Sequence, residues 1–262
     1  ISNGSATSVS LTKVGSGTTI LSGANTFSGA VTISAGTLSV NTVANSGSNS
    51  SLGTGASTPE ISIGATGVLM YTGTGDNTNR AIILTGSSAT IDASGSGTLT
   101  LTGGVTGNTY NLVITGTGSG IESGVIATTT GTLTKQDSGT WTLSGNNTYT
   151  GITTITAGTL TAGDISVTTG ASNIGNASSA VVLGDAGNKG TLLYTGNTDG
   201  YIRGFTINAG GGEVDTTTSG QTLTISTAGI TANGPLTIGG AGNTTITSNI
   251  TGTGGSLTKA GA

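Results

Sequence analysis

The sequence contains no cysteine and no histidine, and only 2 of its 262 residues are proline. The absence of cysteine excludes a disulfide framework and thiol chemistry. Without histidine the chain cannot form a Ser-His-Asp triad, an imidazole general base or a typical zinc site. Collagen is excluded as well, because proline is scarce and glycine does not recur at every third position.

Charged and aromatic side chains are also scarce, at 6 % and 3 % of the residues, and the net charge is −4. Six basic residues provide no patch that could neutralise phosphates, which excludes nucleic-acid binding. No apolar run approaches the roughly 20 residues of a membrane-spanning helix. No basic-then-apolar signal peptide opens the sequence, so any export signal is expected to lie outside it or to have been removed.

The residues that are abundant indicate short β-strands. Leu, Ile and Val alternate with Thr and Ser, for example in Thr98–Thr102 and Thr140–Leu143, and this alternation separates an apolar face from a polar one. The 50 glycines, with Asn, Ser and Asp, stand between these runs, where turns are expected. A chain that is 32 % hydrophobic and weakly charged does not have the composition of a disordered one.

A long internal repeat organises the chain. The segment LTKVGSGTTILSGANTFSGAVTISAGTL starts at Leu11, returns as LTKQDSGTWTLSGNNTYTGITTITAGTL at Leu133, and opens a third time at Leu257. The chain therefore consists of two repeat units flanked by short parts of neighbouring units. Each unit is expected to bury its faces by stacking on its neighbours. The divisions expected are residues 1–10 as the end of a preceding unit, 11–132 and 133–256 as the two units, and 257–262 as the start of a third.

Many short strands are also found in sandwiches and barrels. A unit of about 123 residues is too long for one hairpin and too regular for a Greek key, and few aromatics suit a narrow core of stacked aliphatic side chains. The sequence therefore predicts an all-β protein, a parallel β-helix with roughly five or six coils per unit. With coils stacked about 4.8 Å apart, the rod would be about 50–60 Å long.

The repeated motif resembles the passenger-associated transport repeat of bacterial autotransporters. The resemblance covers Leu11–Val40 and Leu133–Ala162, including L-T-K, the aromatic after Asn-Thr and the closing Ala-Gly-Thr-Leu. Gln136-Asp137-Ser138 departs from it, because the family prefers a small residue and glycine there. The resemblance implies a right-handed parallel β-helix, secreted or exposed at the bacterial cell surface. It also implies that the repeat assists passage across the outer membrane.

Two groups of charged residues recur at the same positions of both units. We interpret the first group as Arg–Asp bridges that fix the register between coils or units, with a repeating binding stripe as the alternative. The second group, the lysines of L-T-K, is expected to lie in solvent and to discourage sideways sheet pairing. The first group is Asp76, Arg80, Asp92, Asp199, Arg203 and Asp215, and the second is Lys13, Lys135 and Lys259.

Catalysis is not expected, and neither is a cofactor or a metal. Glu213 and Asp215 share one strand face, as acids do in pectate-degrading β-helices, but Thr90 replaces Glu213 in the first unit. A glycosidase also needs a cleft with aromatic side chains, and the chain has one Trp. The repeated aromatics Phe27, Tyr71, Tyr149 and Tyr194 are expected to stack in the core.

The sequence therefore predicts a non-enzymatic, structural or adhesive rod at the bacterial cell surface. Its expected partners are neighbouring repeat units or other copies, and a surface polysaccharide or a host cell. A self-assembling filament or sheath subunit remains an alternative, as does a carbohydrate-binding or polysaccharide-degrading β-helix. Rows of threonine such as Thr98, Thr100 and Thr102 also leave ice binding open, although they are sporadic.

Overall fold

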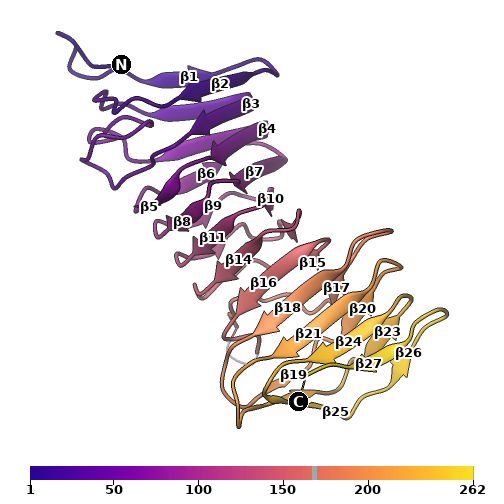
Figure 1. The fold of residues 1–262 in the computed structure, drawn as a ribbon. Coiled ribbons are helices and arrows are strands. Elements are labelled where there is room, and N and C mark those ends of the chain that lie inside the picture. The colour runs from indigo at the N-terminus through magenta and orange to yellow at the C-terminus, as the bar shows by residue number, and fades with distance from the viewer. Residues whose placement is uncertain (167–169, 262) are drawn as a thin grey trace.

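A computed structural model describes residues 1–166 and 170–261 of the chain. Every regular element in this part is a β-strand, and the strands pair in parallel into long ladders. The strands stack from the N-terminal end of the molecule to its C-terminal end (Figure 1). No helix that could cross a membrane occurs in these two ranges. The all-β prediction and the parallel β-helix are thus confirmed.

The strands form three ladders and one short additional ladder. The first ladder contains β1 (Leu11–Lys13), the first part of β3 (Val31–Val40) and of β4 (Ile61–Tyr71), β6 (Ile82–Leu84), β9 (Val105–Thr106) and β12 (Ile126–Ala127). The second contains β2 (Thr18–Leu21), the remainder of β3 and β4, β7 (Ser88–Ala93), β10 (Asn111–Thr115), β13 (Leu133–Lys135), β15 (Thr153–Ile155), β17 (Val181–Leu183), β20 (Phe205–Ile207), β23 (Ile230–Ala232) and β26 (Ile250–Thr251).

The third ladder contains β5 (Thr74–Thr78), β8 (Gly97–Leu101), β11 (Ser119–Glu122), β14 (Thr140–Leu143), β16 (Gly158–Ala162), β18 (Gly190–Tyr194), β21 (Gly212–Thr216), β24 (Leu236–Gly239) and β27 (Leu257–Lys259). The short ladder contains β19 (Asp199–Tyr201), β22 (Thr222–Ile225) and β25 (Asn243–Ile246). One turn of the chain visits three ladders in order, as β6, β7 and β8 do. About 11 turns result, and at about 4.8 Å per turn the rod is about 50 Å long.

The core fills the space between the ladders. Along most strands the burial alternates, as in β14, where Trp141 and Leu143 are buried while Thr140 and Thr142 are partly exposed. Phe27, Tyr71, Tyr149 and Tyr194 are all buried, as the sequence predicts. Trp141 lies against Gly120, where an added Cβ would be 2.5 Å from the indole ring. Each Å² of apolar surface buried in this way stabilises the fold by about 25 cal/mol. This burial favours the stacking of each turn on the next.

Each unit also contains one long excursion between two turns. Residues 41–60 connect β3 to β4, and residues 163–180 connect β16 to β17. The described parts of both excursions are fixed by the same type of bridge, since Asn25 pairs with Ser50 and Asn147 pairs with Ser172. The two units therefore share the position and anchoring of their longest loop.

Equivalent residues of successive units lie on different ladders. Leu11 of β1 pairs with Val31 on the first ladder, and Leu133 of β13 pairs with Thr153 in the same register but on the second. The next copy, β27, pairs with β24 on the third ladder. The first ladder is revisited five times between β1 and β12, and the second unit begins one strand later. A unit is thus five turns plus one third of a turn, so each unit is rotated relative to the one before it.

Candidate functional site

The lysine of the L-T-K motif lies inside the solenoid in both complete units. Lys13 is 6 % exposed and Lys135 is fully buried. The Nζ of Lys135 donates to the carbonyl oxygens of Gln136 and Asp137, both at 2.7 Å, and to that of Ala157 at 3.1 Å. The first two acceptors lie in the corner that directly follows β13, and the third lies in the next turn of the solenoid. The lysine therefore binds one turn to the next.

Lys13 makes the same three contacts in the first unit. Its Nζ donates to the carbonyl oxygens of Val14 and Gly15, and to that of Ala35 at 3.0 Å. The expectation that these lysines are solvated edge charges is wrong for Lys13 and Lys135. The reason is that three carbonyl oxygens replace the hydration shell of each ammonium group, which makes burial of the charge tolerable. We call this arrangement the lysine clamp.

The clamp depends on an unusual backbone conformation two residues after the lysine. Gly15 and Asp137 have φ of 71° and 58°, in the left-handed region. This conformation turns both corner carbonyls toward the ammonium group. Asp tolerates it better than most residues do, and its Oδ2 accepts a hydrogen bond from Thr115 Oγ1 at 2.7 Å. The departure of Gln136-Asp137-Ser138 from the motif is therefore accommodated without loss of the clamp.

Burial changes the acid–base behaviour of Lys135. Desolvation lowers its pKa to about 8, and the nearby carboxylate of Asp137 acts in the opposite direction. The ammonium group of Lys135 therefore loses its proton more readily than that of an exposed lysine.

The recurring arginines anchor the long excursions. Arg80 is 1 % exposed, and its guanidinium donates to the carbonyl oxygens of Leu52 at 2.9 Å and Pro59 at 2.7 Å. Arg203, 2 % exposed, donates in the same way to Ile174 at 3.0 Å and Ser179 at 2.9 Å. Burial lowers the pKa of Arg80 to about 10, against the opposite effect of the Glu60 carboxylate.

The interpretation of these residues as Arg–Asp bridges is therefore wrong. The guanidinium groups bind backbone carbonyls, and in residues 1–166 and 170–261 the one ion pair joins Lys189 to Glu213. The physical reason is that the excursions leave a group of carbonyls unpaired by any ladder, and the arginine fork matches several of them at once. Arg80 and Arg203 remain contacts between turns, but not through carboxylates.

The recurring aspartates share no common partner. Asp76 binds the same excursion as Arg80 does. Its Oδ2 accepts a hydrogen bond from the backbone N–H of Val43 at 2.9 Å. Asp199 accepts from Gly200 N–H at 2.7 Å. Asp92 accepts from Ser94 Oγ, while burial raises the pKa of Asp92. The six predicted residues are thus not brought together into one cluster.

The acid pair of the second unit forms part of an ionic group. Glu213 binds Lys189 of the preceding turn, and Asp215 lies beside Glu213. Burial first, and then the charge of Glu213, raise the pKa of Asp215. Lys189 stands in a loop of the second unit, Asp185–Lys189, that the first unit lacks. Within the described ranges, no group of three or more His, Cys, Asp or Glu could hold a metal ion.

A polar groove lies across the corners of three successive turns of the second unit. It has a volume of about 530 Å³ and carries two carboxylates and one ammonium group beside hydroxyl and amide groups. Hydrogen bonds from Asn188 and from the backbone N–H of Gly187 lower the pKa of Asp185. The groove is lined by Gln136, Asp137, Ser138, Thr156, Ala157, Gly158, Asp185, Asn188 and Lys189.

Two further buried polar groups were missed by the sequence reasoning. Asn147 is fully buried, accepts from Ile126 N–H at 2.7 Å and donates to Asn173 O. Its recurrence as Asn25 inside the motif was the available signal. Glu122 is 2 % exposed, accepts from Gly124 N–H, and its Oε2 has no partner. Burial raises the pKa of Glu122 to about 8, and nothing in the sequence distinguishes this acid from a surface one.

Comparison with known proteins agrees with these repeats. Residues 11–40 and 133–162 each match the model of the passenger-associated-transport-repeat family. The chain is 39 % identical over 125 residues to the adhesin BmaC autotransporter of Brucella suis biovar 1 (strain 1330). The match covers 46 % of this chain and 4 % of that protein, so the chain corresponds to a small part of its relative. No solved structure is significantly similar. Each unit of the parallel β-solenoid therefore opens with a segment that matches the passenger-associated transport repeat.

Proposed function

We propose that the chain is a segment of an adhesive, extracellular β-helical rod of an autotransporter-like protein at the bacterial cell surface. The observation that carries this proposal is the combination of two transport repeats, a continuous solenoid and the 39 % identity to an adhesin. A stack of turns held by backbone ladders supplies length, and its side chains on the outside are free for contact.

The polar groove offers the surface best suited to that contact. Its hydroxyl, amide and charged groups match a hydroxylated ligand, and we propose a surface carbohydrate as the ligand class. The groove lies at the corners of turns, where side chains change without disturbing the ladders. The first unit has Val14-Gly15-Ser16 at the corner where the second has Gln136-Asp137-Ser138, so this contact surface belongs to the second unit.

We further propose that the role is non-catalytic. The two acids that share a strand face are not a free pair, since Glu213 is occupied by Lys189. The expected result with pectate-type and other acidic polysaccharides is therefore binding or no effect, without cleavage. Turnover that is lost in Glu213→Gln would overturn this part of the proposal.

Adhesion can be tested with the purified chain immobilised on beads. We expect the beads to bind epithelial cells or isolated cell-surface polysaccharide, and the double variant Gln136→Ala/Lys189→Ala to bind several-fold less. Asn243→Ala, which changes an exposed residue of β25, is the matched control and should bind as the unaltered chain does. Binding no greater than that of albumin-coated beads across a panel of cells and glycans would contradict the proposal.

A further inference from the structure

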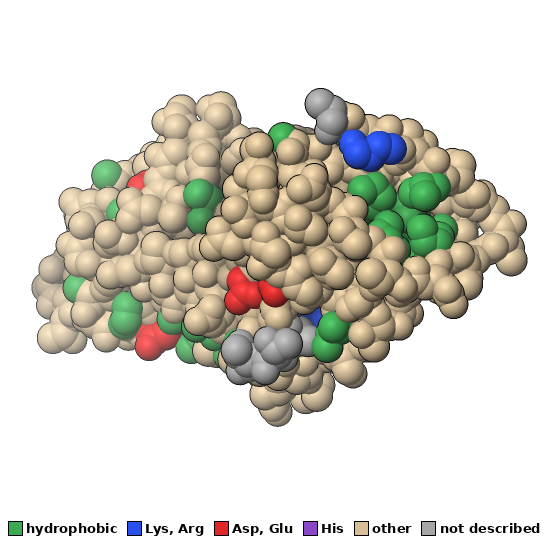
Figure 2. Space-filling view, turned by 90° about the horizontal axis from the view of Figure 1, so that it is seen from below, with side chains coloured by type: hydrophobic (Ala, Val, Ile, Leu, Met, Phe, Trp, Pro, Cys, Tyr) green, Lys and Arg blue, Asp and Glu red, His purple; other side chains and the backbone are tan. Residues whose placement is uncertain are grey.

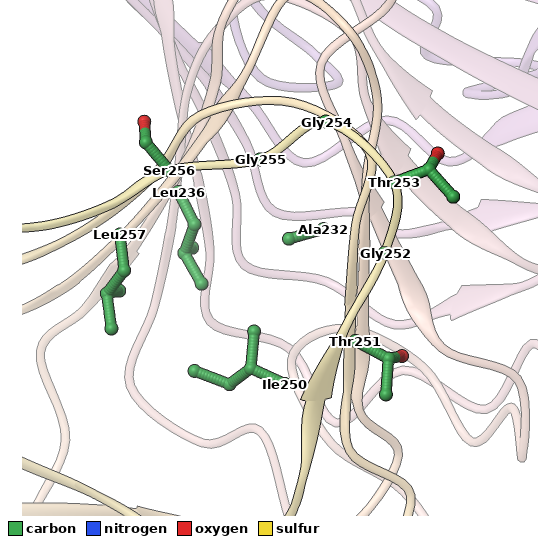
Figure 3. A pocket seen from close by; sticks show the side chains of 10 residues that line it. All are labelled: Ala232, Leu236, Ile250, Thr251, Gly252, Thr253, Gly254, Gly255, Ser256 and Leu257. Carbon is green, nitrogen blue, oxygen red and sulfur yellow. The ribbon is translucent and has the colours of Figure 1, made fainter.

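The buried ammonium group of Lys135 lies directly beneath the polar groove. Its three acceptors are the carbonyl oxygens of Gln136, Asp137 and Ala157, and all three of these residues line the groove. Charged side chains are sparse on the molecular surface, as the face in Figure 2 shows. A second hollow, at the C-terminal end, is lined by small, apolar and hydroxyl-bearing residues without a charge (Figure 3). The groove therefore differs from its surroundings in having charged walls and a cation under its floor.

The clamp turns two backbone N–H groups toward the groove. In a planar trans peptide the C=O and the N–H point in opposite directions. The carbonyls of Gln136 and Asp137 point inward to the Nζ of Lys135. The N–H groups of Asp137 and Ser138 belong to the same two peptides and therefore point outward. All three corner residues are exposed, and in residues 1–166 and 170–261 no other residue accepts from either N–H. Two adjacent donors are thus free at the groove.

The groove has two walls that lie two turns apart. Asp137 follows β13 and Asp185 follows β17, with β15 and the Ala157–Gly158 turn between them. Hydrogen bonds within its own loop hold Asp185 in place. Its Oδ1 accepts from the N–H groups of Gly187 and Asn188 at 2.8 and 2.7 Å, and its Oδ2 accepts from Asn188 Nδ2 at 2.9 Å. A carboxylate oxygen can accept two hydrogen bonds, so Oδ2 has room for a further donor.

Charge and spacing select the group that fits between these walls. Adjacent N–H groups suit an anion, but the carboxylates of Asp137 and Asp185 repel a further negative charge. The ammonium group of Lys189 does not offset this repulsion, because it pairs with Glu213. A neutral secondary amide has an acceptor on one side and a donor on the opposite side. With one hydrogen bond at each side it spans about 8 Å, close to the separation of about 10 Å between corners two turns apart.

We propose that the groove binds the acetamido group of a neutral N-acetylated amino sugar. The acetamido carbonyl accepts from the N–H groups of Asp137 and Ser138, and the acetamido N–H donates to Asp185. Its methyl group contacts Ala157 on the floor. Lys135 does not touch the ligand and is a positioning residue, because it holds the two donors outward. This inference rests on the proposed function, since it names the class of sugar for the groove proposed there.

Two oligosaccharides that differ in one substituent test the ligand class. The tetramer of N-acetylglucosamine carries an acetamido group where cellotetraose, with the same linkage, carries a hydroxyl. Titrated into the isotope-labelled chain, the first should bind about 10-fold more tightly, since it forms about two more hydrogen bonds. In amide nuclear magnetic resonance spectra, the N–H signals of Asp137 and Ser138 should shift. Those of Gly15 and Ser16 should not, because the first unit lacks a wall equivalent to Asp185–Lys189.

The inference and the proposed function can fail separately. Equal affinity for the two tetramers, or unchanged N–H signals of Asp137 and Ser138, would overturn the acetamido site. If beads coated with the chain still adhered to cells in that case, the adhesive function would stand and only the ligand class would be wrong.

Matched lysine variants test the positioning role. Lys135→Met and Lys13→Met each remove three equivalent hydrogen bonds, one set in each unit. At a temperature where circular dichroism shows both variants folded, we expect Lys135→Met to bind the N-acetylglucosamine tetramer several-fold less tightly. Lys13→Met should bind it as the unaltered chain does. Equal affinities of the two variants would overturn the role of Lys135, because a general loss of stability would affect both alike.

Discussion

The Nζ of Lys135 lies 3.1 Å from the carbonyl oxygen of Ala157, which is 22 residues later in the chain and one turn further along the rod. This contact joins turns through a side chain rather than through the ladder. The equivalent distance in the first unit, from Lys13 Nζ to Ala35 O, is 3.0 Å. Both complete units of this chain thus contain a side-chain contact between turns in addition to their strand ladders.

Replacing Lys135 with Met removes the donor of three partly buried hydrogen bonds and leaves a buried apolar side chain beside their carbonyl acceptors. We expect the free energy of unfolding to fall by about 2–4 kcal/mol, since an unsatisfied buried carbonyl costs about 1–3 kcal/mol and relaxation recovers part of it. Urea unfolding followed by circular dichroism measures the change. Lys259→Met is the matched control, with an expected loss below about 1 kcal/mol because Lys259 is exposed. Equal losses in the two variants would argue against a bridge between turns.

Gly158→Ala tests the close approach of the next turn to the clamp. The new methyl group would lie 2.4 Å from Asp137 O and would occupy a residue with φ of 67°. Backbone strain of this kind costs about 1–3 kcal/mol, and the steric contact adds to it. Thermal unfolding should show a clear decrease in Tm. Gly200→Ala is the control, because no atom lies within 4 Å of a Cβ added there. A Gly158→Ala protein as stable as Gly200→Ala would show that the corner can move aside.

Glu122→Gln tests a pH dependence of stability. The pKa of Glu122 is raised from 4.5 to about 8 by burial. Between these values the folded state keeps a proton that the unfolded state releases, so this group stabilises the fold fully below pH 4.5 and loses that effect as the pH rises through about 8. The loss is on the order of a few kcal/mol. We expect the Tm of the variant to exceed that of the unaltered chain increasingly from pH 5 to pH 8.

The second buried group that can change stability with pH is Lys135, whose pKa is lowered to about 8. Well below pH 8, Lys135 is protonated in the folded and in the unfolded state and does not change the pH dependence of stability. Its contribution is an increase in stability as the pH rises from about 8 to about 10.5. The two groups are therefore separated by pH window. A constant difference in Tm between Glu122→Gln and the unaltered chain across pH 5–8 would mean that Glu122 does not titrate in the core.

Arg80→Met should loosen the excursion of residues 41–60 specifically. The variant loses donors to Leu52 O and Pro59 O, and we expect a loss of about 2–4 kcal/mol together with faster amide exchange in that excursion. Arg203→Met, the matched variant, should affect the described parts of residues 163–180 and leave 41–60 unchanged, because contacts in a solenoid are local. Hydrogen–deuterium exchange resolved by peptide distinguishes the two. Faster exchange along the whole rod in either variant would contradict a local anchor.

The strands could be predicted from the sequence because their information is local. Thr140–Leu143 alternates apolar and polar residues, and it forms β14 with the same bounds. Phe27 and Tyr149 are buried as expected, because large repeated aromatics in a weakly charged chain have few other places to lie. The resemblance to the transport repeat agrees with both units.

The lysine clamp could not be predicted, because lysine is rarely buried and its acceptors come from distant parts of the chain. Ala157 is brought to Lys135 only by the length of one turn. The available signal was a constant distance from L-T-K to Ala-Gly, read together with Gly or Asp two residues after the lysine. The partners of Arg80 and Arg203 were predicted wrongly for a related reason. Their acceptors are backbone carbonyls, and the sequence does not indicate which carbonyls of an excursion lack a partner in a ladder.

Because each unit advances by five turns and a third, a feature carried by every unit of this kind would be rotated by a third of a turn from one unit to the next. Equivalent residues would face the same way again only after three units, or about sixteen turns and roughly 77 Å. A contact shared by all units would be offered in three directions, so such a rod has no preferred side toward a surface. A feature present in one unit, such as the polar groove, would face a single direction and occur at a single position along the rod axis.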